Sequence, residues 1–220
     1  MTSELQGRRR AAGFTLIELI VVLGVLGVLL GAALPLASAV VDADRRKEVV
    51  AELDAIAAAL DNHWFDRAAF PSTLDAPTFL GVYLQPGTGN TGLYDGWGQN
   101  LQYVYAVDAA TGTATVHSRG TNAADDGYAN EEFKVTVYAA VPGLVKTRQR
   151  MRVIVEALAN FLELGGTLTG TWSTDRAALG LGSEYAADGF GTAFTLTPAT
   201  LALRSAGPDR TMNTADDVTS

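Results

Sequence analysis

The spacing of hydrophobic residues changes along this chain, and each spacing predicts a different element. Residues 19–41 are almost entirely apolar and carry no charge. Because about 20 apolar residues in helical form cross a bilayer core, this run predicts a membrane-spanning helix. After the charged segment 42–47, apolar residues recur at steps of three and four, which predicts that the helix continues with one face to bury. These residues are Val49, Leu53, Ile56, Leu60 and Trp64.

Beyond residue 100 the pattern changes to short β-rich runs. Residues 101–107 and 114–118 flank a turn-forming stretch, and residues 133–138 alternate as well, which predicts antiparallel strands. A second helical stripe at 151–162 ends at Gly165 and Gly166, and further strands are expected at 194–197 and 201–205. The expected fold class is α+β. A long N-terminal transmembrane or spine helix packs on a small antiparallel sheet, and a second helix-plus-sheet unit of the same type follows.

The two outer parts look like one unit repeated. Three segments of the first part match the second in the same order, which favours a duplication over coincidence. The matched residues are Ile56, Ala59, Leu60 and Asn62 with Ile154, Ala157, Leu158 and Asn160; Asp95-Gly96-Trp97-Gly98 with Asp188-Gly189-Phe190-Gly191; and Ser118-Arg119-Gly120 with Ser205-Ala206-Gly207.

Composition and charge narrow the class of protein. The 220 residues carry a formal net charge of -8 and include no cysteine, so disulfides and thiolate zinc sites are excluded. Lys and Arg are scattered over the outer part, whereas a nucleic acid partner needs clustered cations, so we expect no nucleic acid partner. Arg8, Arg9 and Arg10 precede the apolar run, which places the leader in the cytoplasm and the rest of the chain outside.

Glu18 is an ionisable residue close to the start of the apolar run. A charged group there costs about 2.5 to 3.5 kcal/mol on insertion scales, so it is a functional-site hypothesis that requires a partner. An ordinary secretory signal, cut near Ala37-Ser38-Ala39, is the alternative, but such signals have a shorter apolar region.

Gly13-Phe14-Thr15-Leu16-Ile17-Glu18 resembles the class III signal of type IV pilins and pseudopilins. In that family a prepilin peptidase cuts after the glycine and methylates the new N-terminal residue. The resemblance therefore implies cleavage between Gly13 and Phe14, N-methylation of Phe14, and an assembly role in which Glu18 neutralises the terminal amine of a neighbouring subunit. The implied division of the chain is a leader peptide at 1–13, a transmembrane helix half at 14–41, and pseudopilin-like outer domains at 42–141 and 142–220.

The segment from Tyr94 to Gly98 is similar to the one before the sheet in the major pseudopilin of type II secretion. The resemblance implies a structural filament subunit, not an enzyme. Such a subunit self-assembles from the inner membrane, spans it once with its C-terminal part in the periplasm or outside, and depends on an assembly platform and a cytoplasmic ATPase. A minor pilin acting as a tip adhesin, a type IV pilus or competence filament, and an anchored hydrolase are the alternatives; Asp-rich loops are the main support for the hydrolase.

The C-terminal segment 205–218 resembles the calcium-binding end of major pseudopilins. Calcium takes six to eight oxygen ligands, which carboxylates and backbone carbonyls can supply. We expect Asp209 and Asp216 as side-chain ligands, followed by Asp217, with the carbonyl of Ser205 turned inward. A solvated acidic tail is the alternative. In the first outer part Asn122 stands where the first aspartate would be, and no calcium site is expected there.

Overall fold

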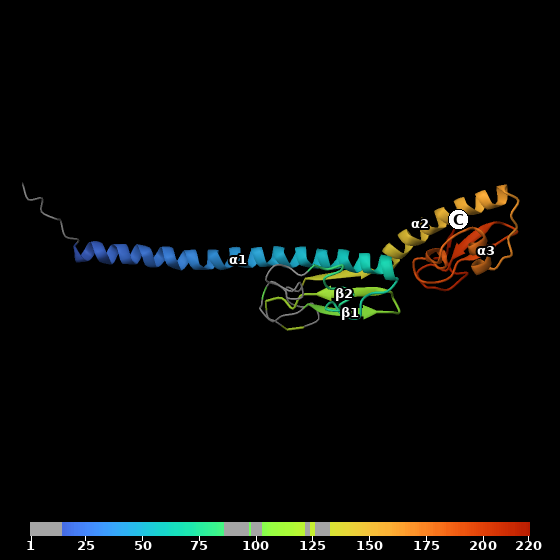
Figure 1. Ribbon diagram of the computed structural model, residues 1–220. Coiled ribbons are helices and arrows are strands. Elements are labelled where there is room, and N and C mark those ends of the chain that lie inside the picture. The colour runs from blue at the N-terminus through green and yellow to red at the C-terminus, as the bar shows by residue number, and fades with distance from the viewer. Residues whose placement is uncertain (1–14, 86–96, 98–102, 122–123, 126–132) are drawn as a thin grey trace, which may run out of the picture. The chain divides into compact units, whose positions relative to one another are not determined.

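The computed structural model describes residues 15–85, 97, 103–121, 124–125 and 133–220 (Figure 1). The chain divides into two compact units, an N-terminal unit, Met1–Arg46, and a C-terminal unit, Lys47–Ser220. The predicted border between residues 141 and 142 lies inside the C-terminal unit, close to the start of a helix at Ala140. The division into two outer domains stays a prediction.

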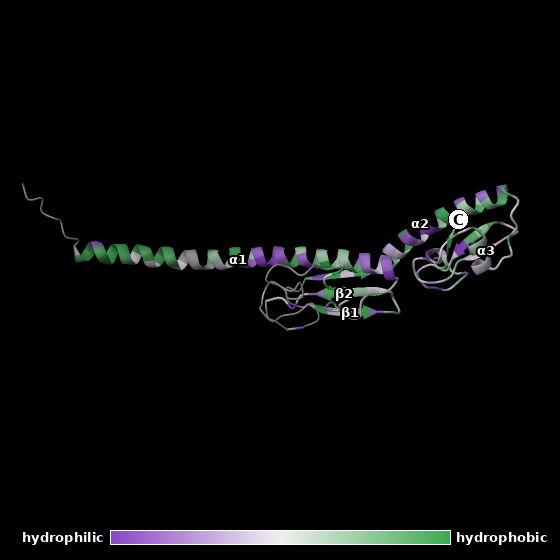
Figure 2. Ribbon diagram, viewed as in Figure 1, coloured by the Kyte–Doolittle hydropathy of each residue, from purple (hydrophilic) through white to green (hydrophobic). Residues whose placement is uncertain are grey.

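One helix, α1, runs from Leu16 to Arg67, so the predicted continuity of the apolar and amphipathic stretches is confirmed. Every described side chain between Thr15 and Gly31 is exposed. Figure 2 shows this stretch as almost uniformly hydrophobic, with polar residues following it along the same helix. Its length and composition suffice to cross a membrane. A helix that exposes apolar side chains on all sides needs a non-aqueous environment.

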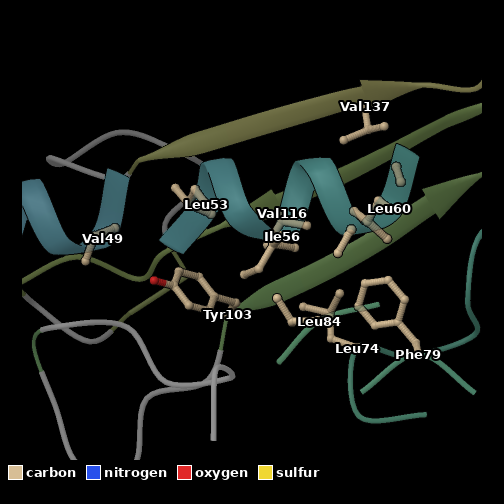
Figure 3. Close-up of a cluster of buried hydrophobic side chains, with 12 residues drawn as sticks. Val49, Leu53, Ile56, Leu60, Leu74, Phe79, Leu84, Tyr103, Val116 and Val137 are labelled. Carbon is tan, nitrogen blue, oxygen red and sulfur yellow. The ribbon is translucent and has the colours of Figure 1, made fainter. Parts of the chain in front are cut away.

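The first sheet lies against the amphipathic half of α1. Its strands are β1, Val104–Asp108, β2, Thr113–His117, and β3, Lys134–Tyr138, paired antiparallel in the order β1-β2-β3. Figure 3 shows the stripe of α1 facing this sheet and the loop before it, as its spacing predicts. The buried cluster contains Val49, Leu53, Ile56, Ala59, Leu60, Leu74, Phe79, Leu84, Tyr103, Ala114, Val116 and Val137.

The second helix and sheet follow directly. α2 spans Ala140–Glu163, α3 spans Trp172–Ala178 and a 3-10 turn, η1, spans Ser183–Tyr185. The strands are β4, Thr195–Thr197, β5, Ala202–Ser205, and β6, Val218–Thr219, in the antiparallel order β4-β5-β6. Of the second stripe, Met151, Ile154 and Leu158 are buried as predicted, but Val155 is 40% exposed. α2 ends just before Gly165, whose φ of +80° suits glycine. The sequence did not predict α3 or β6.

The serine-containing turns matched in the sequence have the same geometry. The Gly120 N–H donates to Ser118 Oγ at 3.0 Å, and the Gly207 N–H donates to Ser205 Oγ at 3.2 Å. Both glycines have positive φ, +64° and +67°, which glycine adopts without strain. The two turns therefore agree with a duplication, which stays a prediction for the domains as a whole.

Candidate functional site

Glu18 lies in the first turn of α1 and bonds to the residue that precedes the helix. The Thr15 N–H and hydroxyl each lie 3.4 Å from Glu18 Oε2, and the Glu18 N–H lies 3.4 Å from Thr15 Oγ1. This reciprocal pair is a capping box, which satisfies N–H groups at a helix start. Thr15 was not predicted as a partner of Glu18, although the Thr-x-x-Glu spacing signals the capping box.

The capping box keeps the Glu18 carboxylate at the N-terminal end of α1, where the helix dipole favours negative charge. The bonds of 3.4 Å are long and therefore weak. An ammonium group could therefore replace Thr15 as the partner of this carboxylate. Gly13 and Phe14 lie outside the described residues, so their predicted cleavage and methylation stay predictions.

In the C-terminal loop the structure brings Asp209 and Asp216 together. The Asp209 N–H donates to Asp216 Oδ2 at 3.0 Å, and the Thr214 hydroxyl donates to Asp216 Oδ1 at 2.7 Å. The Thr214 hydroxyl, followed by the Asp209 N–H, lowers the pKa of Asp216 below its usual range. A Cβ at Gly207 would lie 2.2 Å from the Asp216 carbonyl oxygen, so the loop closes this tightly because residue 207 is glycine.

Of the other two predicted ligands, Asp217 shares a partner with Asp216, because the Thr214 hydroxyl also lies 3.2 Å from Asp217 Oδ1. Asp217 Oδ2 lies 3.3 Å from the Arg204 guanidinium and accepts the Asn213 N–H at 2.9 Å. The Ser205 hydroxyl donates to Asp188 Oδ2 at 2.6 Å. Ser205 was predicted to contribute its carbonyl, and it pairs with Val218 in the sheet. The calcium assignment of the four residues stays a prediction.

The C-terminal loop brings together few side chains that could ligate a metal. Within the described residues no three His, Asp or Glu side chains gather as a metal site would require. Two carboxylates with backbone oxygens suit Ca²⁺, which tolerates irregular oxygen ligands. Asp209 and Asp216 also line a cavity of ≈ 610 Å³ together with Trp64, Tyr138 and Phe190.

Two comparisons with known proteins each found a match, and neither tests the C-terminal loop. A family model described as the prokaryotic N-terminal methylation motif matches residues 8–34, a stretch that includes the predicted cleavage pair and Glu18. The type II secretion system core protein G of Pseudomonas aeruginosa is 34% identical over 139 residues, covering 56% of this chain and 93% of that protein. No solved structure matched the chain.

Proposed function

Because this chain belongs to the family of the type II secretion system core protein G, a pseudopilin family, we propose that cleavage between Gly13 and Phe14 makes it ready for assembly. The same enzyme, a prepilin peptidase, would methylate the new amine of Phe14. The observation that carries the proposal is the match over residues 8–34, which joins the basic leader, the cleavage pair, Glu18 and the apolar helix in one motif.

The chain is a structural subunit of a type II secretion pseudopilus or a related type IV pilus-like filament, and not an enzyme. It is anchored by an apolar helix and belongs to an extracytoplasmic filament. The finer picture is part of the proposal: single-pass insertion in the inner membrane, with residues after 41 in the periplasm. An assembly platform and a cytoplasmic ATPase would drive polymerisation. A tip adhesin is not favoured, because the relative matched over most of its length is a core protein.

Glu18 has a specific place in this proposal. In the isolated chain its carboxylate is held by Thr15 through weak bonds at the helix start. In the filament, the methylated amine of a neighbouring Phe14 would be the stronger partner, since an ammonium gives a charge-assisted bond. Such a pair would offset the cost of a carboxylate inside the apolar filament core and set the stagger between subunits.

Intact-mass measurement and N-terminal sequencing test the proposal directly. Protein would be recovered from membranes and from sheared surface material of cells that carry the secretion machinery. A mature chain beginning at methylated Phe14 in the sheared fraction is the expected result. A chain beginning near Val40, or an uncut chain in both fractions, would contradict it.

A pair of variants separates the assembly role of Glu18 from its capping role. Glu18→Ala should be inserted and cleaved normally but absent from sheared filaments, because both the cap and the charge are lost. Thr15→Val removes the hydroxyl of the capping box and keeps the carboxylate, so it should still enter filaments. Normal filaments from Glu18→Ala would contradict the pairing with Phe14.

We also propose that Asp209 and Asp216 hold a Ca²⁺ ion, with the remaining ligands coming from backbone oxygens and water. The bond from the Asp209 N–H to the Asp216 carboxylate, whose pKa is lowered, supports the proposal because it holds the two residues together. Calcium should raise the melting temperature of the full chain in detergent, because a ligand that binds the folded state stabilises it. Asp216→Asn should abolish the shift, and Asp125→Asn should keep it. An equal shift in both variants would assign the effect to other carboxylates.

A further inference from the structure

One face of α2 combines exposed valines with arginines. Val141, Val145 and Val155 are 61%, 46% and 40% exposed, and Arg148 and Arg152 are exposed between them. The spacings of four, three, four and three residues place all five side chains on one stripe of the helix. We call this stripe the valine–arginine face. Another side of α2 is buried through Met151, Ile154 and Leu158.

The composition of this face is unfavourable for a helix surface that stays in water. Valine is a poorer helix former than the long polar residues usual at exposed positions. Val141 and Val145 lie one turn apart and form a small apolar patch, and Val155 follows beyond the two arginines. Arg148 and Arg152 are like charges one turn apart, which repel each other. Neither arginine has a hydrogen bond or ion pair among the described residues. A partner surface that carries carboxylates for the arginines and apolar side chains for the valines would stabilise this face.

The same chain has a surface of opposite character on α1. Val50 is 42% exposed, Asp54 and Ala58 are exposed, and Asp61 is half-buried. Steps of four, four and three place these residues on one stripe, which we call the acidic face. Its small Ala58 side chain would let another helix approach closely.

Asp61 in particular lacks a compensating charge. Burial raises the pKa of its carboxyl group, and no hydrogen bond or ion pair to it exists among the described residues. A half-buried carboxylate without a partner costs free energy that an approaching guanidinium would recover. The acidic face is therefore a suitable target for Arg148 and Arg152.

We propose that the valine–arginine face of one subunit docks on the acidic face of α1 in a second copy of this chain. The proposal rests on the filament function above, since a filament holds copies side by side. Arg148 and Arg152 are about 6 Å apart along the helix axis, and Asp54 and Asp61 are about 10.5 Å apart, a difference that two long arginine side chains can span. The valines would then cover Val50 and Ala58.

Both faces lie on the same chain, so their opposite charges indicate another copy as the partner. The chain carries a formal charge of -8, so copies repel one another in general, and a filament requires local patches of opposite sign to bring them into register. The contact also gives the second helix-and-sheet part a structural role, in which it links neighbouring subunits.

Cysteine cross-linking tests the contact, and the natural chain contains no cysteine. The full-length Val145→Cys/Ala58→Cys variant would be assembled into filaments and treated with a short bis-maleimide. The expected result is a ladder of linked subunits. The matched control is Val153→Cys/Ala58→Cys, because Val153 is 39% exposed on the flank of the same helix. Filaments that show no ladder, or an equal ladder in the control, would overturn the proposal.

Charge variants test the contribution of the arginines. Arg148→Gln/Arg152→Gln and Gln149→Glu/Asn160→Glu both lower the net charge by two, but the second pair leaves the valine–arginine face intact. Filament yield should fall about fivefold or more in the first and stay unchanged in the second. Reversing both sides, with Arg148→Asp/Arg152→Asp and Asp54→Arg/Asp61→Arg in one chain, should restore the yield. Equal yields from all variants would overturn the proposal.

These outcomes separate the contact from the filament function. If the unaltered chain forms no filaments, the assignment as a filament subunit fails, and the docking proposal fails with it. If the unaltered chain forms filaments and Arg148→Gln/Arg152→Gln forms them equally well, the docking proposal alone fails.

Discussion

The two helix-and-sheet parts of the C-terminal unit are built alike but stabilised differently. In the first part α1 packs on strands of five residues each. In the second part α2 packs on strands of three, four and two residues. The second part also buries the carboxylates of Asp175 and Asp188, each only 1% exposed. Shorter strands supply fewer ladder hydrogen bonds. The stability of the second part therefore depends more on hydrogen bonds within its loops.

The two carboxylates organise those loops. Asp188 accepts bonds from the Phe190 and Thr192 N–H groups and from the Ser205 hydroxyl. Asp175 accepts the N–H and hydroxyl of Thr169 and the N–H of Gly170. Bonds to a charged acceptor are stronger than neutral ones. The second part should therefore be more sensitive to polar substitutions and to acid than the first.

The largest effect is expected where the second part is packed most closely. A Cβ at Gly189 would lie 2.0 Å from the Gly143 carbonyl oxygen, so the backbone of the loop or of α2 must move. Gly189→Ala should destabilise the second part by about 3 kcal/mol or more. Hydrogen exchange followed by mass spectrometry should show faster exchange in β4 and β5 while β1 and β2 stay protected.

Gly112→Ala is the matched control in the first part. Gly112 has a φ of +63°, and its added Cβ would meet Ala139 at an ordinary 3.4 Å. We expect a cost of about 1 kcal/mol from backbone strain. Equal destabilisation by Gly189→Ala and Gly112→Ala would contradict the closer packing of the second part.

The next effect concerns acid sensitivity. Burial alone would raise the pKa of Asp175, but the hydrogen bonds from Thr169 and Gly170 lower it below the ordinary value. Its stabilising contribution is therefore present above the unfolded-state pKa of about 3.9 and is lost as the pH falls toward the folded-state pKa. Asp175→Asn should cost about 2 kcal/mol at neutral pH, and less at pH 3. Urea unfolding at both pH values measures the difference, and a constant difference would contradict the prediction.

The helices and most strands could be predicted because their burial follows a simple period. The stripe from Val49 to Leu60 recurs at helical spacing and is buried. Trp64, the last member of that stripe, packs with Ala139 and Phe190 instead, because the second part covers the end of α1. α3 and β6 escaped prediction because a helix of seven residues and a strand of two residues are too short to show a period.

The site was predictable where a motif is local and less so where partners come from elsewhere. Thr15 and Glu18 are three residues apart, and their spacing alone indicates the cap. Asp217 is adjacent to Asp216 in the sequence, yet one of its carboxylate oxygens pairs with Arg204 on β5. Spacing along a loop does not show which way each carboxylate points, so the acidic residues could be named but not their partners.

A double-mutant cycle tests whether the two parts hold their loops with equivalent serine–aspartate hydrogen bonds. Ser205→Ala and Asp188→Asn should be coupled by about 1 kcal/mol through the hydroxyl–carboxylate bond of 2.6 Å. The sequence pairs Ser118 with Ser205 and Asp95 with Asp188, although Asp95 lies outside the described residues. A duplication predicts similar coupling between Ser118→Ala and Asp95→Asn in urea unfolding. If the free-energy costs of Ser118→Ala and Asp95→Asn simply add, the first part has no equivalent of the Ser205–Asp188 bond.

The smallest effect is expected at the junction of the two parts. Lys146 on α2 donates to the carbonyls of Phe65 and Asp66, which lie in the last turn of α1. A cation at a helix C-terminus satisfies carbonyls that have no partner within the helix and interacts favourably with the dipole. Burial and the nearby Arg150 lower the pKa of Lys146, so part of this gain offsets desolvation. Lys146→Met should therefore cost about 0.5 kcal/mol.

Its main effect should be on cooperativity, because Lys146 links the end of one helix to the other part. In the unaltered chain β1–β3 and β4–β6 should lose hydrogen-exchange protection at similar urea concentrations. In Lys146→Met the second part should open first, since it has the shorter strands. Arg148→Met, at an exposed position two residues away, is the control and should leave the transitions together. Separate transitions in the unaltered chain would show that the two parts are stabilised independently and that Lys146 does not couple them.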